Sequence, residues 1–336
     1  MQIPRHRYPW LLAAGIGLAY ALATRLLVDS GDFYQLFNNG LLSWAFLVVM
    51  PVGLGAITAH FTSAENKWQR LVWGPLLTVL VFLATALLFH LEGLICVAIM
   101  SPLFLLMAGL GALCYSLIAD NRSRPRDKTL VVAVFALLPL VAGPLESRFA
   151  NPDSFRRVEN VIDIAAPAPV VWQHIIRVAP IQAADLSPSL LDGIGFPRPV
   201  AATLTREGVG GVRHATFERG VEFIETVDDW QPLRRLSFSI EPNTATIPPS
   251  TFDEHVTVGG RFFDVLRGTY ELRPLGPGRT RLVLYSQQRV STHLNWYAGL
   301  WTSYVMGEIQ QRILGVLKQR CEASPTPNAS PAGRGA

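Results

Sequence analysis

The stretch VENVIDIAAPAPVVWQHI, residues 158–175, changes from the period of a strand to the period of a helix. In its first seven residues apolar and polar side chains alternate imperfectly, which is typical of a half-buried strand. Pro167 and Pro169 suit a turn and the first positions of a helix, and Trp172 and Ile175 continue with helical spacing. The stretch therefore predicts a strand followed at once by a helix, at the start of a globular domain.

The residues beyond this stretch predict an antiparallel meander closed by one long helix. Strand-like runs are separated by short turn-like segments such as REGVGG and PLGPGR, and strands joined in this way pair antiparallel. In residues 295–320 apolar side chains recur every three or four positions, so this helix should bury a broad stripe against the sheet. The predicted strands are residues 201–205, 212–217, 221–227, 235–240, 255–258, 262–272 and 281–290.

This order of elements, together with VIDIAAPAPVVWQHI and GTYELRPLGPGRTRLVLYSQQRV, resembles the helix-grip superfamily. That superfamily is the START and Bet v 1-like group, also called SRPBCC, and it includes polyketide cyclase/dehydrase-like domains. The resemblance covers about residues 157–321. It implies an α+β domain in which a curved antiparallel sheet grips the C-terminal helix around a cavity. In relatives such a cavity takes hydrophobic ligands such as lipids, sterols or polyketides.

The first half of the chain has the composition of an all-α membrane region. Half of the 336 residues are hydrophobic and only 16% are charged, and most of the apolar excess precedes residue 150. A helix needs about 20 mostly apolar residues to cross the hydrocarbon. A cleaved signal peptide is the alternative for the first apolar run, which is longer than a usual signal core. The five predicted spans are residues 9–28, 41–59, 72–89, 94–119 and 129–145.

Basic residues in the short loops predict the orientation of this region, because lysine and arginine favour the cytoplasmic side. They precede the first run and recur at Lys67, Arg70 and residues 122–128, whereas the loops between have none. With five crossings, the N-terminus is cytoplasmic and the C-terminal domain lies outside, in the periplasm of a bacterium. Arg25 departs from this pattern and is expected to pair with Asp29 one turn later. The apolar cores otherwise carry essentially no charge, which favours an anchor or scaffold over a transporter.

These patterns divide the chain into four parts. The polar segment ESRFANPDSFRR marks the linker, and the tail is rich in Pro, Ala, Ser and Gly, which is typical of disorder. The predicted parts are the membrane region at 1–147, the linker at 148–157, the helix-grip domain at 158–321 and the tail at 322–336.

The candidate ligand contacts lie on the inward face of the predicted sheet and on the stripe of the last helix. Ser286 and Gln288 continue the apolar face of a strand and could orient a polar head group, although such residues more often mark the solvated end of a strand. Arg289 could bind an anionic head group, and core packing alone explains the aromatic residues of the helix. The candidates are Phe238, Ser286, Gln288, Arg289, Trp301 and Tyr304.

Asp253 and His255 fall on one face of a predicted strand and are the candidates for general acid/base chemistry. A structural role explains both without any chemistry. Spacing gives them no third ligand, so no metal site is predicted. The sequence also contains no phosphate-binding loop, dinucleotide fingerprint or nucleophile elbow, so no cofactor is predicted.

The sequence therefore favours a membrane-anchored protein that binds a hydrophobic small molecule or lipid. The alternatives are a polyketide cyclase- or dehydratase-like enzyme, for which no catalytic motif is present, and a non-catalytic assembly or sensing component. The net charge of +4 comes from basic residues that gather beside apolar runs, so membrane topology explains it before nucleic acid does. The predicted partners are the lipid bilayer and a hydrophobic ligand.

Overall fold

A computed structural model of the 336-residue chain describes residues 9–29, 40–62, 66–243 and 258–324. The candidates Asp253 and His255, and the tail from residue 325, lie outside the described residues. The chain divides into two compact units. One comprises Met1–Pro152 with Thr292–Leu294, and the other comprises Asp153–Ser291 with Asn295–Ala336.

The first unit is helical, and four of its described helices are long and apolar enough to cross a membrane. The prediction of five spans is therefore wrong by this measure. The remaining apolar helix, Ala45–Phe61, is shorter and consists of a π-helical turn, η2 (Ala45–Val49), that continues into α3 (Met50–Phe61). Nearly all of its side chains are buried, so packing in the helix bundle explains its apolar character without lipid contact. The four long helices are α1 (Pro9–Asp29), η3 with α4 (Gln69–Trp73 and Gly74–Leu88), α5 (Leu94–Ala119) and α6 (Pro125–Glu146).

Helices α3 and α5 cross at backbone contact. A Cβ atom added to Gly55 of α3 would lie 1.8 Å from the carbonyl oxygen of Ala108. A Cβ atom added to Gly111 of α5 would lie 2.0 Å from the carbonyl oxygen of Val52. Small residues at such a crossing let two helices approach closely, which is how apolar helices gain contact energy when lipid competes for their surfaces.

Two arginines near helix ends of this unit form ion pairs. Arg25 is buried, and its Nε donates to Oε1 of Glu92 at 2.6 Å. Glu92 is a partner that the sequence did not indicate, since the prediction considered only Asp29 on the same helix. Arg70 donates to both carboxylate oxygens of Asp120, at 2.8 and 3.1 Å. This second pair ties the segment before α4 to the segment after α5, so both belong to the same end of the bundle.

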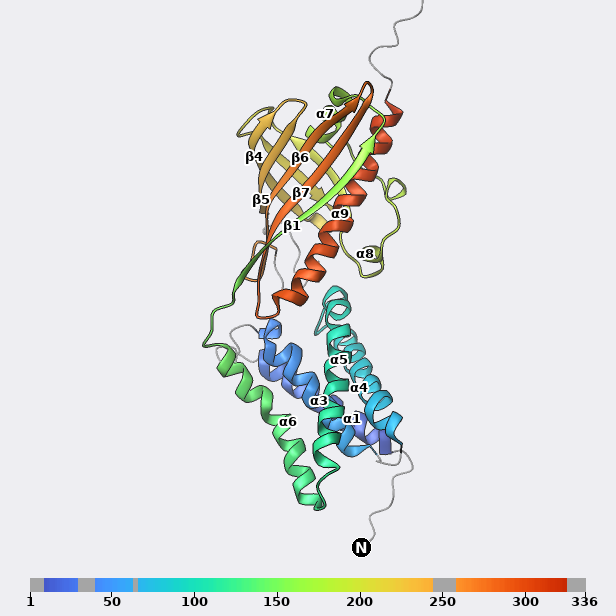
Figure 1. The fold of residues 1–336 in the computed structure, drawn as a ribbon, viewed down its shortest axis with the longest axis vertical. Coiled ribbons are helices and arrows are strands. Elements are labelled where there is room, and N and C mark those ends of the chain that lie inside the picture. Colours follow the sequence, from blue (N-terminus) through green and yellow to red (C-terminus); the bar gives the residue numbers. More distant parts are fainter. Residues whose placement is uncertain (1–8, 30–39, 63–65, 244–257, 325–336) are drawn as a thin grey trace, which may run out of the picture. The chain divides into compact units, whose positions relative to one another are not determined.

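The second unit contains one seven-stranded antiparallel sheet in its described residues, in the order β1-β7-β6-β5-β4-β3-β2 (Figure 1). The sheet curves around the long helix α9 (Asn295–Ala323), and the short helix α7 (Ala168–Ile176) covers one end. This arrangement confirms the predicted helix-grip fold class. The strands are β1 (Asp153–Ile164), β2 (Pro199–Leu204), β3 (Val212–Phe217), β4 (Glu222–Gln231), β5 (Arg235–Pro242), β6 (Phe263–Gly276) and β7 (Arg279–Ser291).

Several strand boundaries differ from the prediction, and two of the differences are the most informative. Strand β1 begins at Asp153, five residues earlier than expected, because residues 153–157 pair with the end of β7, where Asp153 lies opposite Ser291. Residues 228–232, DDWQP, lie between the predicted strands 221–227 and 235–240. Most of this segment instead continues β4, after a shift in register between Val227 and Asp229. A polar strand end and a bulge both resemble a turn in sequence.

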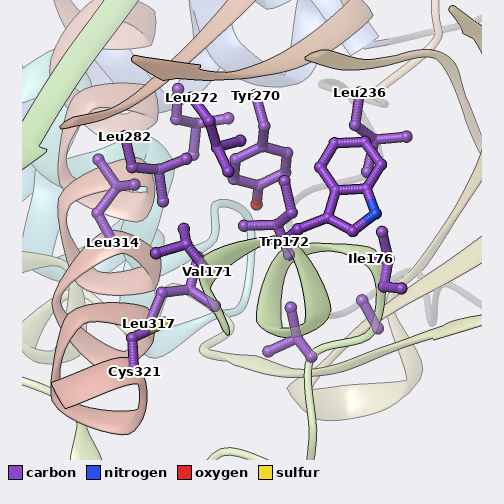
Figure 2. Close-up of a cluster of buried hydrophobic side chains, with 14 of the residues drawn as sticks. Val171, Trp172, Ile176, Leu236, Tyr270, Leu272, Leu282, Leu314, Leu317 and Cys321 are labelled. Carbon is purple, nitrogen blue, oxygen red and sulfur yellow. The ribbon is translucent and has the colours of Figure 1, made fainter. Parts of the chain in front are cut away.

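The core of the second unit lies between the concave face of the sheet, α7 and α9. Figure 2 shows Leu314 and Leu317 of α9 and Val171 of α7 directed toward the sheet residues Leu272 and Leu282. Trp172 of α7 packs edge to face against Trp230 of β4, with ring centres 5.1 Å apart. The apolar spacing noted in the sequence therefore predicts the packing surfaces of α7 and of the second half of α9 correctly, whereas Leu300 and Tyr304 in the first turns of α9 are exposed and not buried against the sheet.

A short helix, α8 (Leu190–Gly193), is held to α9 through Asp192. Arg312 of α9 donates to both carboxylate oxygens of Asp192, at 3.0 and 3.1 Å, and Arg198 donates to one of them at 2.8 Å. Burial opposes the charge, but the hydrogen bonds from the two arginines lower the pKa of Asp192 below its usual value. The stabilisation that the ionised carboxylate of Asp192 gives is therefore complete above the ordinary aspartate pKa, and it is lost as the pH falls through the lower pKa of the folded state.

Candidate functional site

The concave face of the sheet is mainly apolar, but two neighbouring strands each place a charged residue on it. Arg213 of β3 and Glu225 of β4 lie directly opposite each other in the register. Both are buried, and Nη1 of Arg213 donates to Oε2 of Glu225. An ion pair removed from water in this way is not an efficient source of stability, because desolvation offsets most of the attraction.

Aromatic rings from the next two strands surround this ion pair. The guanidinium carbon of Arg213 lies 5.2 Å from the ring centre of Phe238 and 5.8 Å from that of Tyr270. The labelled Tyr270 extends from its strand into the core, toward α7 (Figure 2). Gly268 makes room for the ring of Phe238, since a Cβ atom there would lie 2.5 Å from Cε2 of that ring. The ion pair is thus packed against two aromatic side chains.

The environment changes the acidity of each titratable group in this cluster. Burial raises the pKa of Glu225, against the opposing effect of the neighbouring guanidinium. Burial also raises the pKa of the Tyr270 hydroxyl. For Arg213, burial is the largest single effect and would lower the pKa, but the charges and hydrogen bonds of Glu225 and Tyr270 together outweigh it and raise the pKa above the usual value. Arg213 therefore remains a cationic hydrogen-bond donor inside an apolar domain.

A second polar group lies between β7 and α9. Nε2 of Gln310 donates to Oγ of Ser286 at 2.9 Å, and Nε2 of Gln288 donates to Oγ1 of Thr302 at 3.3 Å. Ser286 and Gln288 are buried, so they do not mark the solvated end of a strand. The predicted register, with Leu282, Leu284, Ser286 and Gln288 on one face, agrees with their burial.

Two buried polar atoms, one in each group, lack a hydrogen-bond partner among the described residues. These are Nε of Arg213, a donor, and Oε1 of Gln288, an acceptor. A buried polar atom without a partner costs about 1–3 kcal/mol. A bound molecule with an oxygen acceptor for the first and a hydroxyl donor for the second would remove that cost.

The other predicted contacts are placed differently. Arg289 donates to the carbonyl oxygens of Gly260 and Arg261, at 2.9 and 3.0 Å, and thereby fastens the segment before β6 to β7. Trp301 is half-buried and meets Tyr304 edge to face, with ring centres 6.2 Å apart, while Tyr304 is exposed. The structure thus places Phe238 beside the ion pair, and it places Ser286 and Gln288 of β7 in contact with α9.

The sequence analysis missed Arg213, Glu225 and Tyr270. The signal was present in the alternation, since Arg213 shares a strand face with Ala215, and Glu225 shares one with Val227. A charged residue on the apolar face of two adjacent strands points to a paired internal site, but only the register shows that the two charges meet. No group of three or more potential metal ligands occurs in the part of the chain that the structure describes.

No protein-family profile and no curated protein matches this sequence. Several solved structures are similar to its C-terminal half. A START superfamily protein from Mycobacterium smegmatis is 14% identical, with 49% of this chain and 97% of that chain covered and a TM-score of 0.32. An aromatase/cyclase from a Streptomyces species is 18% identical, with 50% and 94% covered and a TM-score of 0.32.

A protein from the dynemicin biosynthetic locus is 16% identical, with 50% of this chain and 47% of that chain covered and a TM-score of 0.30. This chain therefore spans about half the length of that protein. Two of these structures are named as a START superfamily protein and an aromatase/cyclase, which are types included in the superfamily that the sequence resembles. The fold class itself follows from the strand order and from the position of α9.

Proposed function

We propose that the C-terminal domain binds an apolar small molecule or lipid that carries at least one oxygen function, and that the N-terminal helices anchor it in a membrane. The observation that carries this proposal is the buried cluster of Arg213, Glu225 and Tyr270 on an otherwise apolar concave face. Ligand sites of this kind are mostly apolar, with a few polar groups that fix orientation. The unpartnered Nε of Arg213 would donate to the oxygen of the ligand.

Anchoring raises the concentration of the domain near the source of such a ligand. An apolar molecule is scarce in water and concentrated in the bilayer, so a domain held beside the membrane meets it far more often than a free one. Supply of the ligand from the bilayer explains why the two halves occur in one chain.

The proposed ligand predicts a specific result in native mass spectrometry of the full chain purified from cells. We expect a co-purifying apolar compound of defined mass, recoverable by solvent extraction. The matched control carries Arg213→Met with Glu225→Leu, which should retain lipids that coat the membrane helices but lose this compound. A wild-type chain that remains free of such a compound, even after incubation with a membrane lipid extract, would contradict the proposal.

The basic residues of the short loops also indicate on which side of the membrane the C-terminal domain lies. Four basic residues occur in residues 122–128, around the start of α6. The pairing of Arg70 with Asp120 places the basic segment around Lys67 at the same end of the bundle. With this end in the cytoplasm of a bacterium, one crossing by α6 puts the C-terminal domain outside. The pairing of Arg25 with Glu92 places the end of α1 at the opposite end of the bundle from Arg70, so the expected sides of the N-terminus and of the domain are both unchanged by the lower number of long apolar helices.

The orientation predicts that alkaline phosphatase fused after Ser324 is active in a bacterial host, because this enzyme folds only outside the cytoplasm. The same reporter fused after Arg122 should be inactive. The reverse pattern of activities would contradict the assigned side.

A further inference from the structure

The first turns of α9 carry an exposed apolar face. Trp296, Leu300 and Tyr304 are 57%, 62% and 38% exposed. Their spacing of four residues places them on one side of the helix, one turn after another. Farther along α9 the exposed positions are polar, such as Gln311 and Gln319. The apolar face is therefore confined to the start of the helix.

The start of β1 lies at the same end of the domain. Asp153 pairs with Ser291 at the end of β7, four residues before α9 begins at Asn295. Nη2 of Arg156 donates to the carbonyl oxygen of Asn295 at 3.0 Å, which holds the start of the helix to β1. The exposed apolar face of α9 therefore lies at the end of the domain where the chain enters it.

This end is also the tethered end. Only residues 147–152 connect α6 to β1, and six residues span at most about 21 Å when fully extended. The covalent connection therefore keeps the start of β1, and with it the start of α9, close to the end of a helix that is long and apolar enough to cross a membrane.

We propose that the face formed by Trp296, Leu300 and Tyr304 lies in the head-group region of the bilayer. Tryptophan and tyrosine favour this region because their rings combine an apolar body with a polar atom, and leucine reaches the acyl chains beneath. In water the same cluster would be an apolar surface without a partner. The proposal rests on the membrane anchoring and is independent of the ligand.

A photoreactive side chain tests this contact in the full chain. We would replace Leu300 by p-benzoylphenylalanine, reconstitute the protein in nanodiscs of phosphatidylcholine and phosphatidylglycerol, irradiate, and measure lipid adducts by mass spectrometry. The control position on the same helix is Gln319, which is exposed but far from the tether. The reference position for lipid contact is Leu137 of α6, which is exposed on a membrane helix.

We expect lipid adducts at position 300 at least tenfold above those at 319 and comparable to those at 137. Labelling at 137 with position 300 no higher than 319 would overturn the proposed surface while leaving the membrane anchor intact. A crosslink from position 300 to a second copy of the chain, in place of lipid, would also overturn it. Absence of lipid adducts at both 137 and 300 would overturn the anchoring and the surface together.

Discussion

Replacing Glu225 with glutamine is expected to lower the free energy of unfolding of the C-terminal domain by about 3 kcal/mol. The substitution leaves Arg213 charged and buried, with no opposite charge beside it. Hydrogen exchange of the β3 and β4 amides in the full chain should measure this loss as about a hundredfold faster exchange where those strands open with the whole domain. The matched control is Glu222→Gln on the same strand, since Glu222 pairs with His214 at a partly exposed site and should change stability by less than about 1 kcal/mol.

A double substitution separates the structural part of this ion pair from its proposed role. Arg213→Met with Glu225→Leu replaces both charges by apolar side chains, which often restores or increases stability. We expect exchange rates close to those of the wild type and loss of the co-purifying ligand. A stable double variant that still carries the ligand would show that the pair does not bind the head group. If the Glu225→Gln variant were as stable as the Glu222→Gln control, the buried charge of Arg213 would not need Glu225 as its partner, and the prediction would be wrong.

Replacing Gly111 with alanine is expected to lower the unfolding temperature of the full chain in detergent by about 6 °C or more, from a loss of about 3 kcal/mol. The new Cβ atom would overlap the backbone of α3 at Val52, and backbone cannot move aside as a flexible side chain can. Helices α3 and α5 would have to separate.

Gly109 on the same helix provides the matched control, because a Cβ atom there meets nothing within 4 Å. Gly109→Ala should leave the unfolding temperature unchanged or raise it slightly, since alanine favours helix over glycine. Equal effects of the two substitutions would mean that helix propensity, and not the crossing of α3 and α5, determines the result.

The sequence predicts the fold well where local chemistry alone determines an element. Strand β3 begins and ends at the predicted residues because glycines precede it and the turn ERG follows. The helix of residues 295–320 is predicted almost to its last turn because its apolar stripe continues throughout. Prediction fails where polar residues extend a strand, as at the start of β1, since their partners on β7 are more than 130 positions away.

The candidate site is less predictable, because it depends on which strands become neighbours. Ser286 and Gln288 could be found by following one strand, since an apolar face simply continues into them. Arg213 and Glu225 acquire their meaning only when β3 and β4 pair in one particular register. The ion pair of Arg25 and Glu92 is comparable, since 67 positions separate its members and no local pattern connects them.

If the proposed ligand binds at the unpartnered Nε of Arg213, the stability of this domain depends on occupancy. A ligand present at a hundred times its dissociation constant adds about 2.7 kcal/mol to the folded state. Proteases and chaperones act on the fraction of molecules that open, so the empty protein would be removed from the cell faster than the loaded one. The amount of this protein would then follow the supply of its ligand, and starvation for that molecule would reduce the protein without any change in its synthesis.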